Sequence, residues 1–285
     1  MKFKILLIII VLAFISCVNK TTRLHYSTLK IITNKPSEEL KLYKPIDGIV
    51  LWDEKKVNLT LDSIGHYSYN FELENPEIIG VQIGNNKFPM IIELDKTYEI
   101  KVLQGLPEFS GDNHEGNKLY GKLPWKSYES TQRAYEIETA KELSIFKDSL
   151  AQSAIHEFEI LEKEGKISPF FLTSAENFIS HFYAEFFLNF ILQKQRGPAP
   201  ISEGFKSMKK NILKENPVDS KTYSPMWGEY LNAAILYNKS SELVEDGEIT
   251  EEEINHMGAT GDINDLYYSF INESISDPEV KEKYL

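Results

Sequence analysis

The stretch FSGDNHEGN, residues 109–117, divides this 285-residue sequence into two parts with different patterns. It is polar and contains two glycines, so we interpret it as a loop, with the domain boundary just after it. Before it, short segments alternate between apolar and polar residues, whereas beyond it apolar residues recur at intervals of three or four. The sequence therefore predicts an α+β fold, with an antiparallel β-sandwich-like domain over residues 24–110 and an α-helical domain over residues 120–285.

Six segments of the first part carry the strand pattern, in which every second side chain is apolar. The stretches 57–61 and 67–73 alternate most cleanly. Turn sequences such as Asp47-Gly48 separate the segments, at intervals that are typical of antiparallel sandwiches or barrels. The expected strands lie around residues 29–31, 40–43, 57–61, 67–73, 80–84 and 98–102.

The second part has the pattern of a helical bundle. An apolar stripe from Leu143 to Leu161 predicts one long helix, which Gly165 ends. Residues 173–176 form a capping-box sequence and predict the start of the next helix. That helix carries a phenylalanine stripe, for which packing in the core is favoured over a ligand pocket or partner groove: Phe178, Phe182, Phe186 and Phe190.

Proline and capping residues mark the remaining helix ends. Gly197-Pro198 is expected to end the phenylalanine-rich helix, and Ser224-Pro225 to begin another. A second capping box covers residues 250–253. Two final helical segments are expected over residues 265–275 and 277–285.

The N-terminus has the features of an export signal. Lys2 and Lys4 precede an unbroken apolar run over residues 5–15, which is too short to cross a bilayer because a spanning helix needs about 20 residues. The run ends in FISC, residues 14–17, which resembles the signal-peptidase site of bacterial lipoproteins. We therefore predict a lipoprotein signal peptide at 1–16, a lipidated tether at 17–23, and Cys17 as the lipidation site.

The lipid on Cys17 would be the membrane partner of the chain, because several acyl chains together hold a protein at a bilayer almost permanently. Cys17 is the one cysteine of the sequence, so its lipidation would leave no thiol in the folded body. Two alternatives stay open: an ordinary cleavage point with an incidental cysteine, and an uncleaved N-terminal anchor. Surface-export signals of similar lipoproteins carry an acidic run after the cysteine, and the tether lacks such a run. We therefore expect a periplasm-facing protein of the cell envelope.

Composition and spacing exclude several kinds of site. The net charge is −12, which argues against nucleic acid as a partner. His156-Glu157 lacks a second histidine at position 160, and the acidic stretch 112–115 lacks the spacing of a calcium loop. The glycine-containing stretch 258–262 follows a helix and is expected to be an interhelical turn. No catalytic residue, metal ligand or cofactor is predicted, and the six histidines are scattered: His25, His66, His114, His156, His181 and His256.

The order of these features resembles the N-terminal half of membrane-anchored thiol–disulfide oxidoreductases of the TlpA/ResA type from Bacteroidetes. The local motif that carries this resemblance is SGDN…GNKLY, within residues 110–120. The resemblance implies a β-domain and a helical segment in front of a thioredoxin domain. The Cys-x-x-Cys motif on which that family's chemistry depends is missing here, so no catalytic residue transfers.

Three functional hypotheses follow. The first is a non-catalytic binding or scaffolding module whose small-molecule or protein partner is unknown. The second is the truncated anchor half of a disulfide oxidoreductase, which genomic DNA beyond codon 285 would reveal through a Cys-x-x-Cys domain. The third is a hydrolase whose site is assembled from distant residues, which spacing alone does not test.

Overall fold

The computed structural model describes residues 25–33, 40–46, 50–59, 66–73, 76–84, 86–102, 107–123, 128–195, 201–222 and 224–285. The predicted signal peptide, the tether and Cys17 lie outside the described residues. Gly197-Pro198, the expected end of the phenylalanine-rich helix, lies outside them as well.

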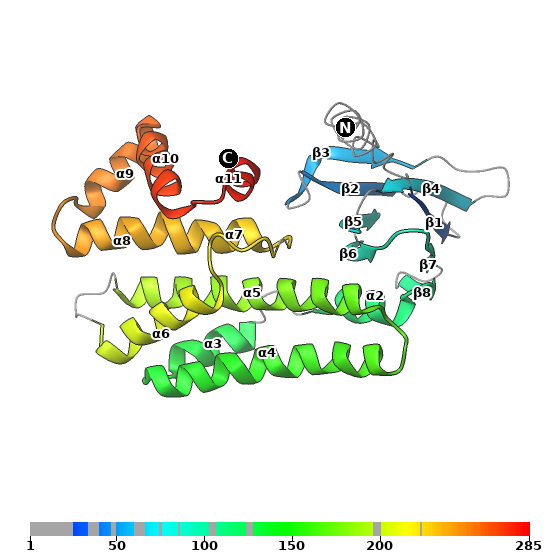
Figure 1. Cartoon of the computed structure of the whole chain (residues 1–285), viewed down its shortest axis with the longest axis horizontal. Coiled ribbons are helices and arrows are strands. Elements are labelled where there is room, and N and C mark those ends of the chain that lie inside the picture. The colour runs from blue at the N-terminus through cyan, green and yellow to red at the C-terminus, as the bar shows by residue number, and fades with distance from the viewer. Residues whose placement is uncertain are drawn as a thin grey trace, which may run out of the picture.

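Alternating side chains build a sandwich of two sheets in the first part of the chain (Figure 1). One sheet has the strand order β4-β1-β7-β8 and the other has the order β3-β2-β5-β6. Buried side chains from both sheets, such as Leu29, Phe71, Val81 and Ile100, meet in one apolar core. The strands are β1 (His25–Thr33), β2 (Leu40–Ile46), β3 (Val50–Asn58), β4 (His66–Leu73), β5 (Glu77–Ile83), β6 (Asn86–Ile92), β7 (Thr97–Val102) and β8 (Pro107–Gly111).

The predicted α+β fold class is confirmed, with strands first and helices after them. The paired strands are antiparallel except for β1 and β7, which are parallel, with Leu29 opposite Tyr98 and Ile31 opposite Ile100. Each of the six expected segments falls at least partly within a strand, whereas β6 and β8 were not expected. The interpretation of residues 109–117 as a loop is wrong, because they end β8 and begin the first described helix.

Helices make up the second part of the chain. Figure 1 shows α5 running along the bundle, between α4 on one side and α7 and α8 on the other. The helices are α2 (His114–Tyr120), α3 (Tyr128–Glu136), α4 (Ala140–Lys163), α5 (Pro169–Gln195), α6 (Glu203–Glu215), α7 (Trp227–Leu231), the π-helix η1 (Asn232–Tyr237), α8 (Asn238–Glu245), α9 (Glu251–Thr260), α10 (Ile263–Ser274) and α11 (Pro278–Tyr284).

Local capping explains where these helices begin and end. The capping box at Thr250 and the stop after α4, with Gly165 at a φ of 69°, are confirmed. The capping box predicted at 173–176 is wrong, because α5 already begins at Pro169. Ser168 Oγ accepts the N–H of Phe171 at 3.0 Å, so Ser168 caps this helix and Pro169 stands at its first position.

The core of the bundle lies around α5, which is apolar on most of its surface. The prediction that the phenylalanine stripe packs in the core is confirmed, since Phe178, Phe182 and Phe190 are buried and Phe186 is half-buried. His181 lies in the same core and is 3% exposed. Its ring stacks on Tyr230, with ring centroids 5.5 Å apart, and its Nδ1 lies 2.9 Å from Ser224 Oγ.

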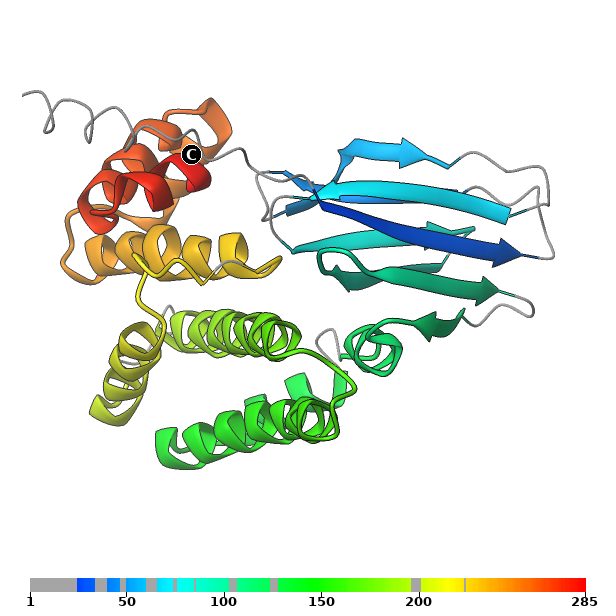
Figure 2. The ribbon, with the colours of Figure 1, turned by 45° about the vertical axis from the view of Figure 1, so that its right-hand side comes forward.

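The helix α2 joins the two halves of the molecule at the edges of both sheets (Figure 2). Asn117 in α2 is fully buried, and its amide makes two hydrogen bonds with Ile91 of the edge strand β6. Ile91 N–H donates to Oδ1 at 2.8 Å, and Nδ2 donates to the Ile91 carbonyl at 3.2 Å. The side chain of Asn117 thus takes the place of a neighbouring strand at this edge.

Close packing at the same place requires a glycine. A Cβ on Gly116 would lie 2.4 Å from Ile167 Cγ2 and 2.8 Å from Phe171 Cζ. Any side chain here would therefore push α2 away from the start of α5. The opposite faces of β6 also belong to different cores, because Met90 and Ile92 face the sandwich core while Ile91 belongs to the core of the bundle.

Glu93, 5% exposed, connects four parts of the fold. Its carboxylate accepts hydrogen bonds from Asn113 Nδ2 at 2.6 Å and from Ser168 Oγ. Asn113 precedes α2, and Ser168 lies between α4 and α5. Its backbone N–H donates to Tyr98 Oη at 2.8 Å, and its carbonyl accepts from Ser27 Oγ at 2.5 Å. We name Glu93, Asn113, Asn117 and Ser168 the junction, because they fix the bundle to the sandwich.

Replacing Asn117 with alanine will destabilise the protein. The change leaves the buried N–H and carbonyl of Ile91 without partners, and each such group costs about 1–3 kcal/mol. We expect a loss of about 2–4 kcal/mol in the free energy of unfolding, measured by urea titration. Asn264→Ala, at an exposed position of α10, is the control and will change stability by less than about 0.5 kcal/mol. Equal effects of the two substitutions would contradict the role of Asn117.

Acid will weaken the wild-type fold through His181. Burial lowers the pKa of His181 to about 4, from an ordinary value of 6.5. Since the unfolded chain binds this proton more readily, the linked stability is fully present above pH 6.5 and is lost as the pH falls towards 4. We expect the wild type to lose about 3 kcal/mol more than His181→Asn between pH 7 and pH 4.

The measurement is urea unfolding of both proteins at the two pH values. His156→Asn removes an exposed histidine from α4 and serves as the control, with a pH dependence close to that of the wild type. A His181→Asn protein that loses as much stability on acidification as the wild type would disprove the assignment.

Candidate functional site

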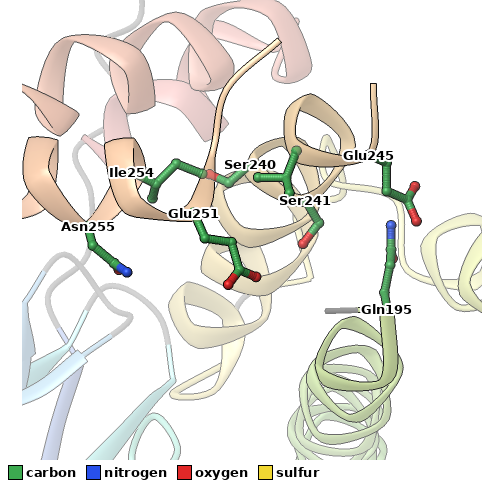
Figure 3. A pocket seen from close by; sticks show the side chains of 8 residues that line it. Gln195, Ser240, Ser241, Glu245, Glu251, Ile254 and Asn255 are labelled. Atoms are coloured by element: carbon green, nitrogen blue, oxygen red, sulfur yellow. The ribbon is translucent and has the colours of Figure 1, made fainter. Parts of the chain in front are cut away.

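A pocket of about 210 Å³ lies at the end of the bundle, where the C-terminus of α5 meets α8 and α9 (Figure 3). α9 reaches this place because α8 ends at Glu245, Gly247 turns the chain at a φ of 72°, and the capping box at Thr250 starts the new helix. The pocket is lined by Gln195, Ser240, Ser241, Val244, Glu245, Glu251, Ile254 and Asn255.

The π-helix η1 sets which side chains of α8 face this pocket. One extra residue in a helical turn rotates every later side chain by about 100° around the axis. η1 spans residues directly before α8, so it fixes the direction in which Ser240 and Ser241 leave the helix. π-Helical segments occur often at functional sites, which makes this end of the bundle a candidate.

Three residues that line the pocket each have a buried polar atom without a hydrogen-bond partner among the described residues: Gln195 Nε2, Ser240 Oγ and Ser241 Oγ. Ser240 is 2% exposed and Ser241 is 4% exposed. A buried hydroxyl or amide without a partner costs free energy, so such atoms are uncommon and are often found where a water or ligand binds.

The geometry of η1 explains why the two serines have no partner. Within α5, Ser174 Oγ donates to the carbonyl of Phe170, four residues earlier, at 3.0 Å. The residues four positions before Ser240 and Ser241 are Leu236 and Tyr237, which belong to η1. The wider turn of a π-helix moves these carbonyls away from the α-helical position, so the usual bond is lost.

The amide of Gln195 is held from behind by α6. Lys209 Nζ donates to Gln195 Oε1 at 3.3 Å, and a lysine can only donate, so the oxygen must face it. The Nε2 group therefore does not face Lys209. Figure 3 shows this nitrogen at the end of the Gln195 side chain, directed towards the segment that carries Glu245.

The lining of the pocket is acidic. Its described residues include the carboxylates of Glu245 and Glu251 and no lysine or arginine. Neither carboxylate forms an ion pair within the described part of the chain. Lys206 partly compensates Glu245, because a hydrogen bond to Glu203 raises the pKa of Lys206 first and the charge of Glu245 raises it less strongly. Glu251 forms no ion pair with a described residue, so the described lining favours positive charge.

The histidines, which are scattered in the sequence, also have separate surroundings in the structure. His25 contacts Asp95 at 2.6 Å, His114 contacts the Gly111 carbonyl at 3.0 Å, and His156 lies on an exposed face of α4. Within the ranges that the structure describes, no cluster of three His, Cys, Asp or Glu side chains is arranged to hold a metal ion. The interhelical turn expected at 258–262 is shorter than predicted, because α9 continues to Thr260 and only Gly261 and Asp262 connect it to α10.

The acidic stretch 112–115 serves the junction. Asp112 accepts the N–H of Thr97 at 2.8 Å, and Asn113, at a φ of 50°, donates to Glu93. A pairing of serine and histidine does occur in the structure, between Ser224 and His181. Ser224 is 1% exposed and already accepts the N–H of Met226 at 3.2 Å, so this pair belongs to the core and has no open face for a substrate.

Sequence reasoning did not identify the pocket. The signal that points to it is the pair of adjacent serines inside a helix, at 240 and 241, where a serine normally weakens the helix unless it has a partner.

No helix of the described residues has the length and apolar character needed to cross a bilayer. No protein-family model matches this chain, and no curated protein matches it.

Proposed function

We propose that this chain is a lipid-anchored protein of the bacterial cell envelope that serves as a non-catalytic binding or scaffolding module. The observation that carries the binding role is the pocket between α5, α8 and α9, with its three unpartnered polar atoms. A protein keeps such atoms at a cost in stability, and a bound ligand would satisfy them.

The junction supports the scaffolding role. Glu93 binds Asn113 and Ser168, and Asn117 binds Ile91, so sandwich and bundle share hydrogen bonds and core residues. A body fixed in this way presents the pocket at a constant position relative to the sandwich. A flexible connection between the domains would not.

The lipid anchor is proposed from the sequence around Cys17. The described body begins at His25, eight residues after this cysteine, so a lipid on Cys17 would hold the sandwich close to the membrane. The same proposal includes the resemblance to the N-terminal region of TlpA/ResA-type oxidoreductases. Here the residues of the SGDN…GNKLY motif lie at the end of β8 and in α2, where the sandwich meets the bundle.

Metabolic labelling with a palmitate analogue tests the anchor. The wild-type chain will incorporate the label, whereas Cys17→Ala will not, because no other thiol is present. Cys17→Ala does not touch the described body, so its far-ultraviolet circular dichroism will match that of the wild type. Equal labelling of the two proteins would refute lipidation.

Protease treatment tests the orientation. A periplasm-facing chain will resist proteinase K in intact cells and will be degraded once the outer membrane is permeabilised. The predicted tether carries Asn19 and Lys20 where a surface-export signal would be acidic, which is the basis for this expectation. Degradation in intact cells, with a periplasmic marker still protected, would place the protein on the cell surface instead.

A further inference from the structure

We infer that the pocket between α5, α8 and α9 binds a small, positively charged amine that also carries hydroxyl groups. The inference deepens the proposed binding role and rests on it. The experiments distinguish failure of the lipid anchor from failure of the ligand site. Labelling of Cys17 tests the anchor, and titration of a ligand into the purified chain tests the pocket.

The size of the pocket sets how much of a ligand it can enclose. A cavity of about 150 Å³ holds benzene, with its six carbon atoms. A pocket of about 210 Å³ therefore encloses about eight non-hydrogen atoms. A branched amino alcohol or one end of an amino sugar has this size.

The charge of the lining selects a cation. Glu251 stands in the first turn of α9 without an ion pair among the described residues, and Glu245 is partly compensated by Lys206. An anionic ligand would be repelled by both carboxylates and would find no lysine or arginine among the described lining residues. An ammonium group would replace the missing counter-ion and donate hydrogen bonds to the Glu251 carboxylate.

The polar atoms of the wall require hydroxyl groups on the same ligand. Gln195 Nε2 can only donate, so it needs an acceptor, which an ammonium group does not supply. Ser240 and Ser241 can donate or accept, and an alcohol oxygen satisfies both modes. These three atoms are covered in the structure, so a ligand reaches them when their side chains turn towards it. Val244 and Ile254 provide the apolar part of the wall.

The experiment compares three ligands with the same branched skeleton. Tris(hydroxymethyl)aminomethane carries the ammonium group, pentaerythritol is its neutral counterpart, and 2,2-bis(hydroxymethyl)propionate is anionic. Each is titrated into the full chain, purified in detergent and phosphate buffer, and followed by ligand-observed NMR. We expect the amine to bind with a Kd of about 1 mM, the neutral polyol at least fivefold more weakly, and the anion not to bind.

Paired substitutions assign the contacts. Glu251→Gln will weaken binding of the amine at least fivefold and leave the neutral polyol unchanged. Glu252→Gln is the matched control, since Glu252 stands beside Glu251 in the first turn of the same helix and does not line the pocket. The control variant will bind the amine as the wild type does.

Ser241→Ala separates ligand binding from folding. Removing a buried hydroxyl that has no partner will keep or raise the thermal unfolding temperature, while it weakens binding of the amine and of the polyol. Ser207→Ala, at an exposed site on α6, will change neither. Equal affinity for the three ligands, no binding of the amine, or equal effects of Glu251→Gln and Glu252→Gln would overturn the inference.

Discussion

The buried carboxylate of Glu93 is the interaction on which the arrangement of the two domains depends. It follows β6 and accepts hydrogen bonds from Asn113, before α2, and from Ser168, the cap of α5. Among the described residues no lysine or arginine pairs with it, so neutral donors alone satisfy its oxygens. Such an arrangement tolerates little displacement, because a carboxylate left without donors in a buried position is costly. The backbone of Glu93 also forms hydrogen bonds with Ser27 and Tyr98 of the sandwich. One residue therefore holds the sandwich and the bundle in a fixed relative position.

The strands that could be predicted from sequence are those with one buried face and one more solvent-exposed face. β4, for example, alternates between buried Phe71 and exposed neighbours, and the period of two is plain. β6 has no such period, because the sandwich buries one face and the bundle buries the other. Its Pro89 also argued against a strand, yet β6 lies at the edge of its sheet, where a missing N–H is tolerated.

Helices were predictable wherever the caps were unambiguous. The box at Thr250 formed as expected, whereas Thr173 and Ser174 donate to carbonyls four residues earlier, inside α5. Short-range sequence cannot separate these two uses of a hydroxyl. The helix α6 was overlooked, although Phe205, Met208 and Ile212 are spaced as its buried face requires. The pocket was not predicted, because the adjacent serines do not by themselves show which face of α8 turns inward, and the register of η1 decides this.

The polar end of the bundle and its apolar middle show two different uses of burial. Around α5, aromatic rings fill the interior, and His181 stays neutral there with Ser224 as its partner. Near Gln195, the interior has hydroxyl and amide groups whose hydrogen-bonding capacity is unused. The first region contributes to stability, whereas the second lowers it, which is the usual compromise between a stable fold and a binding site.

The position of β6 between the two cores decides where the chain can be cut or fused to another protein. An isolated sandwich, cut after β8, would expose Ile91 together with an unsealed strand edge, and such edges recruit further strands and lead to aggregation. Gene fusions or truncations that preserve solubility must therefore carry α2 and the beginning of α5 along with the strands. The smallest transferable unit extends well past the point at which the strands end.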